Sequence, residues 1–300
     1  MDATTGRSGL GRIVVGVDGS PFAQTAVTWA AQEAARRGTS LCLVHATDTD
    51  ALPELAFRTE IEQSRRSGRA LLDRTAHDVA AHHPDVVVLK ELSGGSPSRG
   101  LRSAAALSGT IVVGHRGLGG FSALLLGSVG LKLAAEATTP LVVVRGVDEP
   151  AEAGSVVAAV RDGNDLGVAR AAAREARLRK VSLKLLHVWR TAPYTVVRTT
   201  RRNGNGEGAG EHVRALADVA EHVHEEFPEL ALEAVGEKSQ SVPGALVEAT
   251  RHADLLIVGG RRSPGYLGPT LGRTTLGLLQ HAHCPVELIP RSGPGHGSTS

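Results

Sequence analysis

Residues 111–144 read IVVGHRGLGGFSALLLGSVGLKLAAEATTPLVVV, and residues 256–289 read LIVGGRRSPGYLGPTLGRTTLGLLQHAHCPVELI. Glycine and proline recur at the same places in both stretches, 145 positions apart. The matching continues towards the start of the chain, with small changes of offset that are typical of loops differing in length. Self-similarity of this kind indicates two copies of one unit. The matching pairs are Gly114 and Gly259, Gly127 and Gly272, Pro140 and Pro285, Asp73 and Asp218, His77 and His222, His45 and His187, and Asp18 and Asp162.

The length of 300 residues agrees with two copies, because domains commonly have about 150 residues. We predict a first domain at residues 1–147, a second at 154–290 and a disordered tail at 291–300. The stretch 146–154 is short, polar and contains proline and glycine, as is typical of a linker. A second loose segment is expected at 198–210, inside the second copy.

Short apolar runs alternate with helical stretches in each copy. The runs are almost continuously apolar, which is typical of parallel strands buried on both faces. Ser20-Pro21 predicts the start of a helix, since serine is a preferred N-cap and proline suits the first helical position. The alternation predicts an α/β fold, with one open five-stranded parallel sheet per copy. The expected strands are 12–18, 40–46, 85–92, 110–114 and 140–145, then 156–162, 181–189, 229–237, 254–260 and 285–290; the expected helices of the first copy are 22–37, 59–82, one from 96, and 127–137.

Composition and charge exclude several classes of protein. The formal net charge is +2, so nothing drives the chain towards nucleic acid or an anionic membrane. Aromatic residues make up 3% of the chain, which argues against surfaces that stack bases. Cys42 and Cys284 lie in or beside apolar runs and are expected to be buried. The N-terminus does not resemble a signal peptide and no apolar run has the length of a membrane span, so we expect a cytoplasmic protein.

A glycine pattern follows the fourth strand of the first copy: Gly114-x2-Gly117-x9-Gly127-Ser128. Glycines allow backbone N–H groups to approach an anion without obstruction from a Cβ atom. Gly127, Ser128 and Val129 open a predicted helix, whose N-terminus carries free N–H donors and partial positive charge. The pattern therefore favours a phosphate site, and a loop that merely turns the chain is the alternative.

The unit resembles the universal stress protein family along nearly its full length, in both copies. The matching features are IVVGVDGS at 13–20, the strand ending in LVHA at 43–46, the glycine pattern, and TTPLVVVR at 138–145. The resemblance implies a Rossmann-like fold of the adenine-nucleotide alpha-hydrolase type and a regulator of the bacterial stress response. It also implies homodimerisation and pairing of the two copies through their last strands, with a protein partner that the sequence does not identify.

The resemblance further implies an ATP site in the first copy, where the ATP could carry a bound Mg²⁺ ion. Asp18 would accept hydrogen bonds from the ribose hydroxyls. Gly16 would lie under the nucleotide, and Ala46 would meet the adenine through its backbone. The residues implied at the phosphates are Gly114, Gly117, Gly127, Ser128 and Val129. ADP, AMP or a cyclic nucleotide stay open as the resident ligand.

The second copy departs from this pattern. Arg262 stands in place of Gly117, and Arg273 in place of Ser128. Asp162 aligns with Asp18, although Arg161 is a competing match. We expect impaired or altered binding there, because two motif positions gain bulk, while an arginine could also pair with a phosphate.

Other chemistry finds little support in the sequence. His281, His283 and Cys284 lie close together, but no further ligands are apparent and no metal site is expected. There is no Walker A lysine, no G-x-G-x-x-G after the first strand and no G-x-S-x-G elbow. No nucleophile–base pair is found, so no catalytic residue is assigned. Two alternatives to an ATP-binding regulator stay open: a slow ATPase at the same site, and a nucleotide-free dimerisation scaffold.

Overall fold

The computed structural model describes residues 11–50, 52–105, 109–117, 126–145, 153–190, 207–260 and 271–290. The chain divides into two compact units, residues 1–149 (unit 1) and 150–300 (unit 2). The predicted tail, most of the predicted linker, and residues 198–206 of the predicted loose segment lie outside the described residues. No helix within the described ranges is both long and apolar enough to cross a bilayer.

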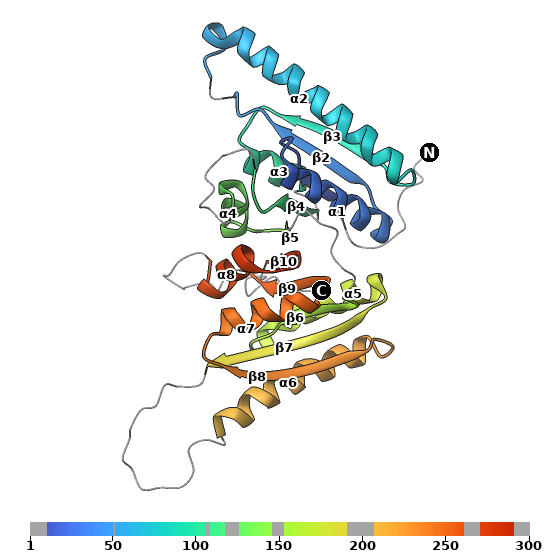
Figure 1. Ribbon diagram of the computed structural model, residues 1–300, viewed down its shortest axis with the longest axis vertical. Coiled ribbons are helices and arrows are strands. Elements are labelled where there is room, and N and C mark those ends of the chain that lie inside the picture. Colours follow the sequence, from blue (N-terminus) through green and yellow to red (C-terminus); the bar gives the residue numbers. More distant parts are fainter. Residues whose placement is uncertain are drawn as a thin grey trace, which may run out of the picture. The chain divides into compact units, whose positions relative to one another are not determined.

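Unit 1 is an α/β unit with a five-stranded sheet in the order β3-β2-β1-β4-β5, and all four neighbouring pairs are parallel. Helices α1 and α2 contact each other, as do α3 and α4, so each pair covers one face of the sheet (Figure 1). This confirms the predicted fold class. The elements are β1 (Ile13–Gly16), α1 (Pro21–Arg37), β2 (Leu41–Ala46), α2 (Glu54–His82), β3 (Val88–Ser93), α3 (Pro97–Ala105), β4 (Thr110–Gly114), α4 (Ser128–Ala135) and β5 (Leu141–Val144).

Unit 2 repeats this plan with the strand order β10-β9-β6-β7-β8, again with parallel neighbours. One addition is a short 3₁₀ turn, η1, between its first strand and first helix. The elements are β6 (Ser155–Ala159), η1 (Gly163–Asp165), α5 (Leu166–Arg179), β7 (Ser182–Arg190), α6 (Glu207–Glu226), β8 (Leu232–Ser239), α7 (Val242–Ala249), η2 (Thr250–His252), β9 (Leu255–Gly259), α8 (Arg273–His281) and β10 (Val286–Ile289).

Most predicted boundaries hold to within a few residues, and the exceptions have local causes. Helix α1 begins as expected, since the Ser20 hydroxyl accepts a hydrogen bond from the Ala23 N–H at 3.1 Å. Strand β3 begins three residues later than expected, because Val86 N–H donates to the His83 carbonyl and forms a turn there. Helix α2 begins earlier than expected, directly after Pro53.

The central strands form a core of aliphatic side chains, and both cysteines belong to it. Cys42 in β2 and Cys284 before β10 are each 2% exposed. Burial raises the pKa of the Cys42 thiol and raises that of Cys284 to about 12. Because the thiolate is the reactive form of cysteine, both thiols are unreactive in the native fold.

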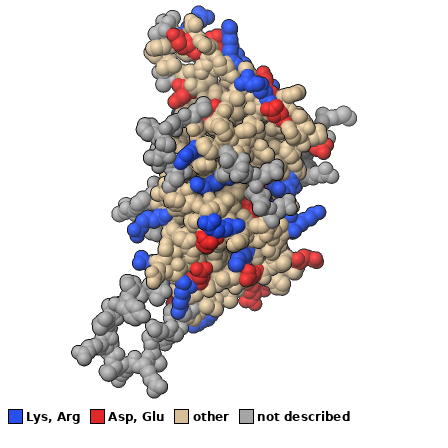
Figure 2. All heavy atoms as spheres, viewed as in Figure 1, with Lys and Arg blue, Asp and Glu red and all other residues tan. Residues whose placement is uncertain are grey.

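Charged side chains of both signs are mixed over α2, the helix at the top of the space-filling view (Figure 2). On this helix Arg66 pairs with Glu62 at 3.1 Å, and both side chains are exposed. Asp73 pairs with Lys90 of β3 at 2.6 Å. The basic Arg65-Arg66 pair is therefore part of a solvated helix surface of mixed charge.

The end of β4 packs against the start of α1. A Cβ atom added to Gly114 would lie 2.5 Å from the Phe22 carbonyl oxygen, so only glycine fits there. The neighbouring His115 ring meets the Phe22 ring edge-on, with centroids 4.5 Å apart. Burial and the nearby Arg145 lower the pKa of His115 to about 4. The ring is therefore neutral at physiological pH.

We expect Gly114→Ala to lower the free energy of unfolding by about 1–3 kcal/mol, because the added methyl group forces β4 and α1 apart. Urea denaturation would measure the loss. Gly16→Ala is the matched control, since its Cβ would meet Leu101 at an ordinary 3.4 Å. An equal loss in the two variants would contradict the packing role of Gly114.

We expect His115 to make unit 1 less stable in acid. Its pKa in the folded state, about 4, lies below the usual 6.5, so its contribution is complete above 6.5 and is lost as pH falls towards 4. Melting temperatures at about pH 7 and pH 5 should differ less in His115→Gln than in the wild type, because glutamine does not titrate. Equal differences would show that His115 does not contribute.

Candidate functional site

The strand order of unit 1 reverses between β1 and β4, and the two strands lie side by side. Helix α1 leaves β1 towards one face, whereas α3 and α4 flank β4 on the other. Ligands of open α/β sheets bind at such a switch point, beyond the carboxyl ends of the strands. The candidate site is therefore built by the residues that follow β1 and β4.

Asp18 and Gly117 meet at this point, although they are far apart in the sequence. The Asp18 carboxylate accepts a hydrogen bond from the Ser20 N–H at 2.9 Å through its Oδ1. Its other oxygen, Oδ2, would lie 2.6 Å from a Cβ atom added to Gly117. Glycine thus lets the loop after β4 approach the carboxylate closely, and the second glycine of the pattern lies beside the residue expected to bind the ribose.

The N-terminus of α4 holds the last part of the motif. Gly127 is the N-cap, but its N–H already donates to the His115 carbonyl at 2.8 Å. This bond fastens the helix start to the end of β4. Ser128 and Val129 occupy the first turn, where N–H groups have no partner within the helix. The side chain of Ser128 is exposed.

The remaining predicted residues lie at strand ends of the same edge. Gly16 ends β1, and Ala46 ends β2, where it pairs with Ser93. Gly114 ends β4, where its packing against Phe22 already explains the glycine. Residues 118–125, the middle of the glycine pattern, lie outside the described part of the chain.

Matching hydrogen bonds show which residue of unit 2 corresponds to which residue of unit 1. In unit 1 the His45 ring Nδ1 lies 2.7 Å from the Val17 carbonyl oxygen. In unit 2 His187 Nδ1 lies at the same distance from the Val160 carbonyl oxygen. The two histidines, one in β2 and one in β7, therefore make the same backbone contact in their units.

Val17 and Val160 are thus equivalent, and the residue after each occupies the same place. Counted from these valines, Arg161 stands at the position of Asp18, and Asp162 follows one residue later. The extra residues of unit 2 form the η1 turn, in which the Asp162 carboxylate accepts a hydrogen bond from the Asn164 N–H at 2.9 Å. Unit 2 has an arginine at the place of the carboxylate in unit 1.

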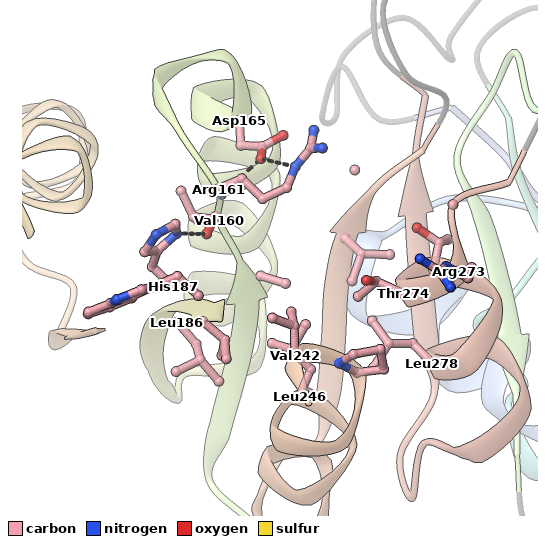
Figure 3. Close-up of a pocket in the computed structure, with 18 of the residues that line it drawn as sticks. Val160, Arg161, Asp165, Leu186, His187, Val242, Leu246, Arg273, Thr274 and Leu278 are labelled. Carbon is pink, nitrogen blue, oxygen red and sulfur yellow. Dashed lines mark hydrogen bonds and ion pairs between the residues drawn. The ribbon is translucent and has the colours of Figure 1, made fainter. Parts of the chain in front are cut away.

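A cavity of about 1030 Å³ opens at the carboxyl ends of β6, β7 and β9 in unit 2 (Figure 3). Its apolar wall includes Leu186, Val242, Leu246 and Leu278. Arg161 and Arg273 reach it from β6 and from the start of α8. The volume is at the upper end of the range of about 300–1,000 Å³ that is common for small-molecule sites.

Three rings line one side of this cavity: His187, Trp189 and His212. Trp189 stacks on His212 with centroids 5.0 Å apart, and the two histidine rings are joined by a 2.9 Å contact between His187 Nε2 and His212 Nδ1. The low total of aromatic residues, 3% of the chain, did not predict this cluster, because three rings suffice to build it. Comparison of HVW at 187–189 with HAT at 45–47 would have found the tryptophan.

The described residues contain no group of three or more histidine, cysteine, aspartate or glutamate side chains arranged to hold a metal ion. Within the H-x-H-C segment, the His283 N–H donates to the Thr250 hydroxyl at 2.8 Å. The raised pKa of Cys284 keeps its thiol protonated, which opposes metal ligation.

Comparisons with known proteins agree with the repeat. The model of the universal stress protein family matches residues 9–145 and again 154–290. Universal stress protein Rv2623 of Mycobacterium tuberculosis (strain ATCC 25618 / H37Rv) is 30% identical over 312 residues, covering 96% of this chain and 99% of that protein.

Among solved structures, a universal stress protein from Archaeoglobus fulgidus DSM 4304 covers 93% of this chain and 96% of its own, with a TM-score of 0.67 at 14% identity. A universal stress protein from Archaeoglobus fulgidus in complex with dAMP covers 45% of this chain and 96% of its own, with a TM-score of 0.34 at 20% identity. The family model accounts for nearly all of both units, and the chain therefore belongs to the universal stress protein family.

Proposed function

We propose that unit 1 binds an adenine nucleotide, ATP in the first place, and that the protein acts as a nucleotide-dependent regulator in the bacterial stress response. The observation that carries this proposal is the meeting of Asp18, Gly117 and the start of α4 at the switch point between β1 and β4. A hydroxyl acceptor and a phosphate donor set then lie at one edge of one sheet.

The residues fit the parts of a nucleotide. Asp18 can accept hydrogen bonds from two ribose hydroxyls, and its hold on the Ser20 N–H orients the carboxylate. Gly16 and Ala46, at the ends of β1 and β2, would border the base. The N–H groups of Ser128 and Val129 and the Ser128 hydroxyl would bind phosphate oxygens, with Gly117 allowing the close approach.

Positive charge gathers near the same loop. Burial lowers the pKa of the Arg145 guanidinium, and the neighbouring Arg116 lowers it further, so two cations lie near each other after β4 and β5. A polyphosphate bound at the start of α4 would relieve their mutual repulsion.

Regulation fits this site better than catalysis. ATP hydrolysis needs a metal ion and a group that orients water, and Asp18 is the one carboxylate that we can place beside the motif in the described residues. We propose that nucleotide binding changes the affinity for a partner protein, with a homodimer in the cytoplasm as the working form. Such a change requires that the nucleotide favours one of two states.

We expect MgATP to raise the melting temperature of the full chain, and Ser128→Asp to abolish the rise, because a carboxylate at the start of α4 repels the phosphates. At about 100 times the dissociation constant, binding should add about 2.7 kcal/mol of stability. Asp18→Asn should weaken binding while keeping an acceptor for the Ser20 N–H. Differential scanning fluorimetry would measure both.

Arg273→Asp is the matched control, because it places the same carboxylate at the corresponding position of unit 2 and should leave the effect of ATP on unit 1 intact. A rise in the wild type that survives both Ser128→Asp and Asp18→Asn would place the nucleotide elsewhere. No rise in any of these proteins would favour the scaffold.

A further inference from the structure

Unit 2 has the opposite charge at the place where unit 1 would bind a ribose. Arg161 follows Val160 as Asp18 follows Val17, and the matching histidine contacts fix this equivalence. A carboxylate accepts hydrogen bonds from hydroxyl groups, whereas a guanidinium only donates. Arg161 therefore suits an anionic oxygen, such as that of a phosphate, better than the two hydroxyl groups of an unmodified ribose.

Arg161 is held in place for such a role. Its Nε lies 3.3 Å from Asp165 Oδ2, and its backbone N–H donates to the same oxygen at 3.0 Å. Asp165 is 1% exposed, whereas the side chain of Arg161 is 51% exposed. Because the contact uses Nε, the end of the guanidinium extends away from Asp165 (Figure 3) and can donate two parallel hydrogen bonds to a phosphate.

Arg273 adds a second cationic group to the cavity. It is the first residue of α8, and its side chain is exposed. The partial positive charge of a helix N-terminus disfavours a cation there and favours an anion. An anion bound at this helix start would interact favourably with both the helix and the guanidinium. In unit 1 the same place holds Ser128.

The third difference is the aromatic wall. Trp189 lies two residues after His187 and lines the cavity, whereas Thr47 stands two residues after His45 in unit 1. Trp189 is stacked with both His187, at 5.4 Å between centroids, and His212, at 5.0 Å, so the three rings form one polarisable wall against which a base can pack. One cavity thus combines a surface for a base with two separate guanidinium groups.

We propose that the cavity of unit 2 binds a nucleotide that carries a phosphate on its ribose, in preference to a nucleotide whose ribose hydroxyls are free. Arg161 pairs with the ribose phosphate, Arg273 and the start of α8 hold the 5′-phosphate, and the wall of three rings borders the base. The same exchange, from a carboxylate that binds ribose hydroxyls to an arginine that binds a ribose phosphate, separates two classes of dinucleotide site. The inference rests on the proposed function of unit 1, which supplies the position of the ribose.

The test compares adenosine 3′,5′-bisphosphate with AMP, which differ by one phosphate, using calorimetric titration of the full chain. We expect the bisphosphate to bind at least about tenfold more tightly in the wild type, the effect of one charge-assisted pair. Arg161→Gln should reduce the difference to less than about threefold, and Arg161→Lys should restore part of it. Arg273→Ser should weaken both ligands alike, because both carry a 5′-phosphate.

Asp18→Asn separates this inference from the proposed function. A preference for the bisphosphate that survives Asp18→Asn and disappears in Arg161→Gln supports the inference, even if ATP fails to stabilise unit 1. Equal affinities in the wild type, an unchanged preference in a folded Arg161→Gln, or loss of the preference in Asp18→Asn would each overturn it. Equally tight binding of inorganic pyrophosphate would also overturn it, since the cavity would then select anions without reading a nucleotide.

Discussion

The parallel direction of every neighbouring strand pair within each unit determines the rest of the structure. Each strand must be followed by a crossover, so all carboxyl ends gather at one edge of the sheet. At the strand-order reversal the flanking helices depart to opposite faces, which leaves the loops after β1 and β4 uncovered by either helix pair. The fold makes this edge available, and the residues placed there decide which ligand it suits.

The two units have kept their internal contacts and changed this edge. Glu33 and Arg37 form a buried ion pair on α1, and Glu175 and Arg179 form its counterpart on α5. His45 in unit 1 and His187 in unit 2 make the same contact with a backbone carbonyl. Because breaking a buried pair leaves a charge without compensation, such contacts resist substitution. Ser128 and Arg273, which are exposed at the open edge, carry no such penalty and can diverge.

The sequence predicted the fold because its information is local and repeated. Continuous apolar runs and the Ser20-Pro21 helix start specify strands and helices with little help from distant parts of the chain. Gly114 and Gly127 were found for the same reason, although their contacts with Phe22 and the His115 carbonyl differ from the phosphate contacts expected of them. A pattern locates a glycine without identifying the atom that requires it.

The sequence alone could not predict which residues of the two units correspond, or which distant residues meet at the site. A short insertion between β6 and α5 shifts the apparent match from Arg161 to Asp162, and only the strand-end hydrogen bonds correct it. The approach of Gly117 to Asp18 joins segments from opposite ends of unit 1. No spacing rule encodes such a contact, because it depends on how the crossovers return the chain.

The two cysteines divide evenly between the units, one in β2 and one before β10, and both are sealed from solvent. Each unit thus contains one buried thiol whose modification reports the local unfolding of that unit. A thiol reagent reaches Cys42 only when unit 1 loosens and Cys284 only when unit 2 does, so the rates at which the two sites are modified report the local stabilities of the two halves separately. Within a single unlabelled chain, the effect of a ligand on either half can be followed without cutting the halves apart.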